Sequence, residues 1–241
     1  TIDAMKDIDN GQTFMLTASS DTFVGNEKGD VFNAYDVEVL AGAKNTLTGI
    51  DSLDGGEGKD TLNVKSDKAI AAVSATVKSI ETINLESSLG VAFNTTTYEG
   101  VETLNSNKSA DTVTLTAAAT TDVNVSGVAN TAAGLGTVTT VNGGKTVTVT
   151  QAMDKATDAI SVQGAVNVNV TATDVINTSA DAVGSEGIKV GTTTEVTGTV
   201  NVTSTGATIA DTAGATATAM DAIAVTGGTT VTVTQSANST S

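Results

Sequence analysis

The chain has 241 residues, a formal net charge of −16, and no Cys, His, Trp or Pro. Without Cys and His it has no disulfide, no thiol nucleophile, and neither the commonest general base nor the commonest ligands of transition metals. The remaining metal ligands are oxygens, which favour calcium or magnesium, and the negative charge argues against nucleic acid and anionic membranes as partners.

The first 15 residues, with Ile2, Met5 and Ile8 as their apolar positions, predict a linker or a cap over the end of the core. They contain neither an initiator Met nor a basic-then-apolar signal peptide. No apolar run approaches the roughly 18 residues of a membrane-spanning helix, so we expect no membrane insertion. The chain also ends within a Thr/Val pattern, which indicates a segment of a longer protein.

Residues 16–63 carry the spacing that is most specific for a chemistry. Residues 55–63 read GGEGKDTLN and match every specified position of the calcium-binding nonapeptide G-G-x-G-x-D-x-U-x, in which U is a large apolar residue. Residues 16–24, 25–33 and 46–54 keep the Asp at the sixth position and the apolar residue at the eighth. Glycines allow a tight turn with converging carbonyl groups, the Asp adds a charged oxygen, and the apolar residue anchors the turn in a core.

These four units resemble the RTX, or hemolysin-type, calcium-binding repeats. The resemblance implies that an ion lies between turns two repeats apart, so that 25–30 and 55–60 face each other, with residues 34–45 inserted between the pairs. It implies side-chain ligands at Asp21, Asp30, Asp51 and Asp60, and mainly carbonyl ligands at Gly25, Glu27, Gly55 and Glu57. The other candidate ligands in these turns are Asn26, Gly29, Asp54, Gly56 and Gly58. Since several repeat glycines are replaced, we expect one to three calcium ions and not a long series.

From residue 60 a four-residue pattern of acid, Thr, aliphatic residue and Asn recurs. It begins at positions 60, 81 and 102, an interval of 21 residues. A fixed period of this length, in segments rich in Thr, Val and Ile, is typical of a β-solenoid. We therefore predict an all-β fold, a right-handed parallel β-helix with rungs of about 21 residues. A leucine-rich repeat has a similar period but needs more leucines and a helix in each unit.

The same register predicts the environment of the repeated positions. Leu62, Ile83 and Leu104 point into the core, while Thr and Asn form outward ladders. The acids Asp60, Glu81 and Glu102 then form a column with a spacing of about 4.8 Å, which repels itself unless cations, lysines or water intervene. Two interpretations stay open for the two glutamates: solvated or lysine-paired side chains, and calcium ligands.

From residue 111 onward, short stretches alternate aliphatic and small polar residues, as in a strand with one buried face. Residues 141–151 recur closely as 225–235. We predict a Thr/Val-rich solenoid over 64–241, with a possible division near 110–136. Longer loops are expected at about 151–159, 172–187 and 204–222. Two immunoglobulin-like sandwiches are the alternative, against which the missing Trp, Cys and Pro and the retained period weigh.

The pattern of acid, Thr, aliphatic residue and Asn after a degenerate RTX region, in an acidic chain rich in Thr, Ala and Val, also resembles calcium-dependent bacterial surface-layer proteins and RTX adhesins. The resemblance implies type I secretion, an extracellular location on the bacterial cell surface, and calcium-dependent folding and self-assembly. A cell-surface glycan is a further implied partner, through regions outside this chain.

Catalysis has little support in the residues. Acid pairs such as Asp51 with Asp54 or Glu99 with Glu102 could serve a glycosidase, but a sugar groove usually presents aromatic residues, and the chain has two Tyr and no Trp. All 11 basic residues are lysines, so the Arg expected of a β-helix lyase is missing. We predict a structural, calcium-binding surface-layer component and no enzyme, with a stalk or ligand-binding segment of an RTX adhesin as the alternative.

Overall fold

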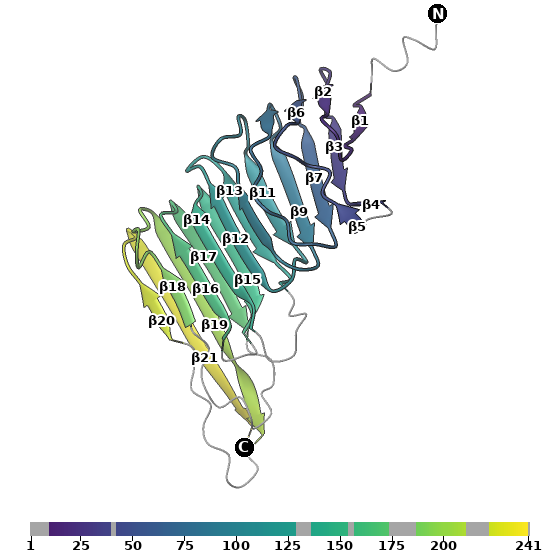
Figure 1. Ribbon diagram of the computed structural model, residues 1–241. Helices are drawn as coiled ribbons and strands as arrows, with labels where there is room; N and C mark the ends of the chain where they lie inside the picture. The colour runs from purple at the N-terminus through teal and green to yellow at the C-terminus, as the bar shows by residue number, and fades with distance from the viewer. Residues whose placement is uncertain are drawn as a thin grey trace, which may run out of the picture.

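The computed structural model describes residues 10–39, 42–128, 136–153, 157–173, 187–210 and 222–240. This part of the chain is all-β and contains no helix. Nearly all of its strands lie in parallel sheets that stack along one direction (Figure 1). It therefore also contains no helix that could cross a membrane. The predicted all-β, parallel and stacked architecture is confirmed.

One wall of the molecule is a ten-stranded parallel sheet that runs from one end of the stack to the other (Figure 1). Its strands, in spatial order, are β1 (Thr13–Met15), β3 (Val31–Tyr35), β7 (Thr61–Ser66), β9 (Thr82–Ser87), β11 (Thr103–Asn107), β13 (Asp122–Ser126), β15 (Thr146–Ala152), β17 (Asn167–Thr173), β19 (Thr199–Ala210) and β21 (Thr230–Thr240). Because each pair is parallel, the chain must leave the sheet and return after every strand.

The return segments build the other walls. A six-stranded parallel sheet contains β10 (Val91–Asn94), β12 (Thr112–Ala117), β14 (Val138–Gly143), β16 (Ala159–Gln163), β18 (Gly187–Val190) and β20 (Ile223–Val225). Nearer the N-terminus the return strands are β2 (Thr22–Val24), β6 (Ser52–Asp54) and β8 (Thr76–Lys78), which form a three-stranded parallel sheet. An antiparallel hairpin, β4 (Val37–Val39) and β5 (Gly42–Lys44), lies within the predicted insertion 34–45.

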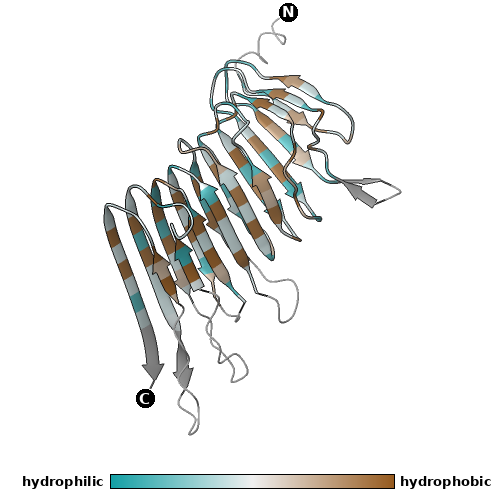
Figure 2. Ribbon diagram, turned by 60° about the vertical axis from the view of Figure 1, so that its left-hand side comes forward, coloured by the Kyte–Doolittle hydropathy of each residue, from teal (hydrophilic) through white to brown (hydrophobic). Residues whose placement is uncertain are grey.

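The core lies between these walls and is built from columns of aliphatic residues. Inward and outward positions alternate along each strand, as Figure 2 shows by alternating brown and pale or teal bands. One column is fully buried and continues in register through most of the ten-stranded sheet: Phe32, Leu62, Ile83, Leu104, Val123, Val147, Val168 and Val200. Alternation in the sequence therefore translates directly into a continuous core.

On the outward face of the same sheet, asparagines form a ladder. Each side-chain Nδ2 donates to the Oδ1 of the preceding asparagine over 2.9–3.0 Å, along Asn33, Asn63, Asn84, Asn105 and Asn124. The steps in sequence are 30, 21, 21 and 19 residues. The interval of 21 residues thus holds where the sequence repeats regularly. In the other coils, the loops change the number of residues in the coil.

We expect the asparagine ladder to contribute to the stability of the fold. Replacing Asn84 by Ala removes its bonds to both Asn63 and Asn105, and we expect the free energy of unfolding to fall by about 1–2 kcal/mol. Urea denaturation followed by circular dichroism measures this change. Thr82→Ala is the matched control, since Thr82 lies two residues away on the same strand and face; an equal loss in the control would contradict a specific ladder contribution.

Several boundaries differ from the sequence prediction. Within the predicted cap, residues 13–15 form the edge strand β1, paired with β3, while residues 1–9 lie outside the described part. The strands after residue 111 continue the same parallel sheet, and β13 pairs with β15 across the division predicted near 110–136. Parallel pairing is incompatible with the antiparallel immunoglobulin-like alternative. The predicted loops at 172–187 and 204–222 lie largely outside the described residues, but β19 extends to Ala210.

Candidate cation site

The turns 25–30 and 55–60 lie directly on one another, each joining a short return strand to the ten-stranded sheet. The N–H of Asp30 donates to Asp60 Oδ1 over 2.6 Å. Two further N–H groups bridge the coils: that of Gly25 donates to the Asp54 carbonyl (2.8 Å) and that of Glu57 to the Asn26 carbonyl (3.1 Å). The structure thus brings together the two turns that the resemblance to calcium-binding repeats paired.

Glycine is required in this stack at Gly56 and Gly58. Their φ angles are 91° and 117°, in the region that other residues rarely adopt. A Cβ at either position would also lie under 3 Å from the backbone of Asn26 or Lys28 in the neighbouring turn. These glycines therefore serve both the turn conformation and the close approach of the two coils.

The aspartates at the sixth repeat position act as acceptors for backbone amides. Asp21 Oδ2 accepts from the Thr17 N–H (2.7 Å), and Asp51 accepts from the N–H groups of Asp21 (3.0 Å) and Thr48 (2.7 Å). Asp30 is fully buried, and it accepts from Gln12 at Oδ1 and from Asn26 at Oδ2 (2.7 Å). In these three residues the carboxylate closes its own turn or ties it to the next coil, a role that needs no metal.

Asp60 departs from this pattern. Its side chain is 1% exposed and its Oδ1 accepts from Asp30, but its Oδ2 is buried and has no hydrogen-bond partner. The amide that would correspond to the Asn26 N–H is that of Gly56, which donates to Asp54 Oδ1 instead (3.2 Å). A buried carboxylate oxygen without a partner is costly and points to a missing proton, water or cation.

Burial raises the pKa of the Asp60 carboxyl above its ordinary value of 3.8. The hydrogen bond from the Asp30 N–H lowers this pKa in part, whereas the nearby charges of Glu81, Asp30 and Asp54 raise it further. The folded state therefore holds this proton more tightly than the unfolded state. In chelator, the contribution of Asp60 to stability is largest below the unfolded pKa and falls as the pH rises through the folded pKa.

The direction of this pH dependence of stability can be measured by comparison with an uncharged variant. We expect the parent to lose stability relative to Asp60→Asn as the pH is raised from about 4 to about 7 in chelator. Thermal unfolding followed by circular dichroism at several pH values gives the difference in melting temperature between the two proteins. The effects of the other carboxylates on stability cancel in this difference, because both proteins contain them. A difference that stays constant with pH, or that changes in the parent's favour, would contradict the raised pKa.

The other predicted ligands divide into two groups. The side chains of Glu27 and Glu57 are exposed, and Gly29, Gly56 and Gly58 are exposed as well. These residues therefore have only backbone oxygens to offer between the two coils. Asp21 and Asp51 form a separate pair in the other turn, at residues 16–21 and 46–51. Among the described residues no three acidic side chains come together as a metal cluster. A cation here would need carbonyl ligands as well as carboxylates.

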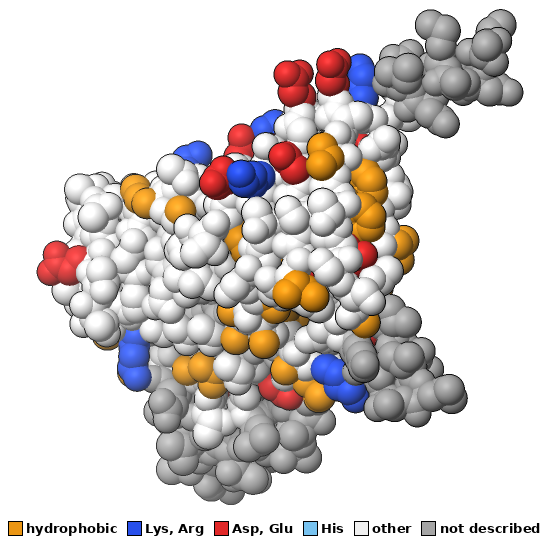
Figure 3. Space-filling view, turned by 45° about the horizontal axis from the view of Figure 1, so that its top comes forward, with side chains coloured by type: hydrophobic (Ala, Val, Ile, Leu, Met, Phe, Trp, Pro, Cys, Tyr) orange, Lys and Arg blue, Asp and Glu red, His pale blue; other side chains and the backbone are white. Residues whose placement is uncertain are grey.

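The predicted column of acids continues past the nonapeptides. Glu81 Oε2 accepts from the Asp60 N–H over 2.8 Å. Glu102 forms an ion pair with Lys59 (2.7 Å) in which both side chains are mostly exposed. Such a surface pair contributes little to stability, but it matches the lysine-paired interpretation of Glu102. Charged side chains gather toward the N-terminal end of the face in Figure 3, whereas the opposite end is mostly uncharged.

One buried acid was missed by the sequence analysis. Asp158 is fully buried, and its Oδ1 accepts from both the N–H and the hydroxyl of Thr137. It lies in the segment 151–159, for which the sequence predicts a loop. Its signal is visible in retrospect, because Asp158 and Ile160 repeat the spacing of sixth-position Asp and eighth-position apolar residue found in the nonapeptides.

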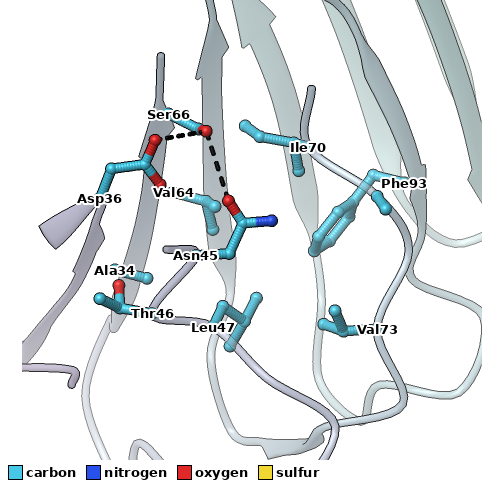
Figure 4. A pocket seen from close by; sticks show the side chains of 11 residues that line it. Ala34, Asp36, Asn45, Thr46, Leu47, Val64, Ser66, Ile70, Val73 and Phe93 are labelled. Carbon is cyan, nitrogen blue, oxygen red and sulfur yellow. Dashed lines mark hydrogen bonds between the residues drawn. The ribbon is translucent and has the colours of Figure 1, made fainter. Parts of the chain in front are cut away.

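Two of the hollows lined by the described residues bear on ligand binding. The first, shown in Figure 4, lies beside Asp36, Asn45 and Ser66, and the Ser66 hydroxyl donates to Asp36 Oδ2 over 2.7 Å. Its volume of about 10 Å³ leaves room for at most one water. The second is an open hollow beside Tyr98, whose hydroxyl donates to the Val73 carbonyl (3.2 Å) and whose pKa burial raises to about 12. The Tyr98 hydroxyl is thus engaged within the fold.

No protein-family model and no curated protein matches this chain.

Proposed function

We propose that this chain is a structural segment of a bacterial surface layer, an extracellular β-solenoid that folds and assembles with calcium. The solenoid is right-handed, as nearly all parallel β crossovers are, with a basic rung of about 21 residues. The observation that carries the proposal is the stack of turns 25–30 and 55–60, whose aspartates are buried at the start of a continuous ten-stranded sheet.

The donor set of these turns fits calcium. It offers carboxylate and backbone carbonyl oxygens and no imidazole nitrogen or thiolate sulfur, and one carboxylate oxygen, Asp60 Oδ2, is buried without a partner. Asp30 and Asp60, with the carbonyl groups of the two turns, would hold the ion. When bound, calcium supplies positive charge that offsets the repulsion between the neighbouring carboxylates. In the low calcium of the cytosol that repulsion would disfavour the fold, which suits a protein that folds after secretion.

A structural role is supported by the hydrogen bonds that the polar residues form within and between the coils. The asparagine ladder and the carboxylates of Asp30, Asp51 and Asp158 hold one coil to the next, while the carboxylate of Asp21 closes its own turn. The core columns continue to Val231 and Val233 in the last described coil, so the same stacking extends to the end of the ten-stranded sheet.

A calcium titration tests the proposal. Circular dichroism and sedimentation velocity are followed together on the parent and on an Asp30→Asn/Asp60→Asn variant, with Glu27→Gln as a control in the exposed part of the same turn. We expect calcium to raise the melting temperature and the particle size of the parent and the control, and to change the double variant much less. A parent that stays unchanged between chelator and millimolar calcium would overturn the calcium role.

The alternative of an RTX adhesin stalk predicts a different result in the same experiment. A stalk segment should gain stability with calcium yet remain monomeric, because its partner is a ligand and not another copy. Growth of the particle with calcium therefore favours the surface layer, and stabilisation without growth favours the adhesin.

A further inference from the structure

A cluster of four buried polar side chains interrupts the apolar core in the middle of the solenoid. Thr137 directly precedes β14, Thr139 lies in β14, Gln151 lies near the end of β15, and Asp158 directly precedes β16. Each of the four is at most 3% exposed. The cluster therefore draws together one coil and the beginning of the next, in the interior of the molecule.

The adjacent coils place apolar residues at the corresponding positions. The in-register neighbours of Thr139 are Val113 and Ile160, and a neighbour of Gln151 is Ala172. All three neighbours are fully buried. Burying a hydroxyl or an amide costs free energy that an aliphatic side chain avoids. Thr139 and Gln151 thus depart from the repeating pattern of the core, and the fold alone gives no reason for this departure.

The hydrogen bonds of the cluster give each group a distinct position. The Thr137 hydroxyl donates to Asp158 Oδ1 (3.0 Å) and accepts from Gln151 Nε2 (3.0 Å). The Thr139 hydroxyl donates to Gln151 Oε1 over 2.6 Å. Because the amide carbon Cδ is bonded to both Oε1 and Nε2, it lies beside the two hydroxyl groups. One buried hydroxyl thus meets an amide with a carboxylate on its proton, while a second hydroxyl meets the carbonyl oxygen.

These positions are the parts of an acyl-transfer site. A hydroxyl is a weak nucleophile unless a neighbouring base takes its proton, and Asp158 lies where that base is needed. A donor at the carbonyl oxygen stabilises the negative charge that develops there during attack, and the Thr139 hydroxyl is such a donor. Burial keeps out the water that would otherwise compete with the Thr137 hydroxyl for the amide carbon.

We propose that Thr137 and Gln151 form an ester cross-link within the folded chain. Thr137 Oγ1 attacks Gln151 Cδ, so that the Oγ1–Cδ bond forms and the Cδ–Nε2 bond breaks. Asp158 takes the hydroxyl proton and passes it to Nε2, which leaves as ammonia with the electron pair of the broken bond. One hydroxyl and one amide thus give one ester and one ammonia, and the reaction requires no oxidant and no second substrate.

The ester joins two walls of the solenoid within one coil. Thr137 lies at the start of β14 in the six-stranded sheet, and Gln151 lies in β15 of the ten-stranded sheet. A covalent link of this kind restricts the unfolded chain as a disulfide does, in a sequence that has no Cys. This role goes beyond the proposed surface-layer function and does not depend on calcium.

Mass spectrometry of the full chain, purified in its folded state, tests the cross-link. The intact protein should weigh less than its sequence by the mass of one ammonia molecule. Trypsin cleaves after Lys108, Lys145 and Lys155, so Thr137 and Gln151 fall in the separate segments 109–145 and 146–155. We expect these segments to stay joined after denaturation and digestion. Mild alkali, which hydrolyses esters faster than amides, should then separate them.

Two variants identify the reacting groups. Thr137→Val removes the nucleophile and Asp158→Asn removes the base, each with little change in side-chain volume, and both should keep the full sequence mass. Thr140→Val is the matched control, because Thr140 lies on the other face of β14 from Thr139. The control should lose ammonia and keep the two segments joined, as the parent does.

The parent decides the proposal even where a variant fails to fold. A parent with the full sequence mass, whose segments 109–145 and 146–155 separate after digestion, overturns the cross-link. Segments that stay joined in Thr137→Val overturn it as well, because another residue then supplies the linking atom. A link that resists mild alkali is not an ester, and this result contradicts the proposed chemistry.

Discussion

Replacing Phe32 by Ala should lower the free energy of unfolding by about 3–5 kcal/mol, among the largest effects of any single substitution in this chain. Phe32 is fully buried, its ring stacks on that of Phe14 with centroids 4.8 Å apart, and Phe14 stacks on Phe23 in turn. On its other side it is in register with Leu62. Removing the ring leaves a cavity between two coils that the stiff, hydrogen-bonded sheets cannot close.

Denaturant unfolding of Phe32→Ala, at a fixed calcium concentration, measures this loss. Met15→Ala is the matched control, since Met15 lies on the neighbouring strand and is 54% exposed, and we expect its effect to stay within about 0.5 kcal/mol. In a stacked coil each rung contacts mainly its neighbours. Hydrogen exchange should therefore accelerate in β1, β3 and β7 and not in β17 or β19, and a uniform acceleration along the chain would contradict this local response.

The coarse fold followed from the sequence because its signals are local and repeated. Alternation in segments such as 146–150 determines which side of the strand is buried, and the interval between Leu62, Ile83 and Leu104 places these residues in one column. Neither signal depends on distant residues. The coil lengths were less predictable, because a loop can lengthen a rung without changing the register of its strands, as between Asn169 and Asn201, 32 residues apart.

The candidate site was harder to predict, because the same spacing serves two physical purposes. An Asp at the sixth position of a tight turn can hold calcium, and it can equally accept the turn's own buried amides, as Asp21, Asp30 and Asp51 do. The pattern does not distinguish these uses. What singles out Asp60 is a buried Oδ2 without a partner, because the corresponding amide donates to Asp54, and this depends on the three-dimensional stack.

The roles of Asp30 as an acceptor of backbone amides and as a calcium ligand can be separated by measuring a substitution in the absence of calcium. Asp30→Ala leaves the N–H groups of Gln12 and Asn26 without their acceptor, and hydrogen bonds to a charged group contribute about 1.5–3 kcal/mol each. We therefore expect the variant to lose about 3–5 kcal/mol in chelator, where no calcium can be involved. Urea denaturation of the parent and variant in chelator measures this loss.

Glu27→Ala is the control in the same turn, because its side chain is exposed and accepts none of these amides. It should leave the stability in chelator almost unchanged. Were Asp30→Ala equally harmless in chelator and harmful only with calcium, Asp30 would be a ligand and the amide contacts would be incidental. A loss in chelator that calcium enlarges would show both roles in one residue, because a carboxylate that fixes the turn also fixes the carbonyl groups that an ion must meet.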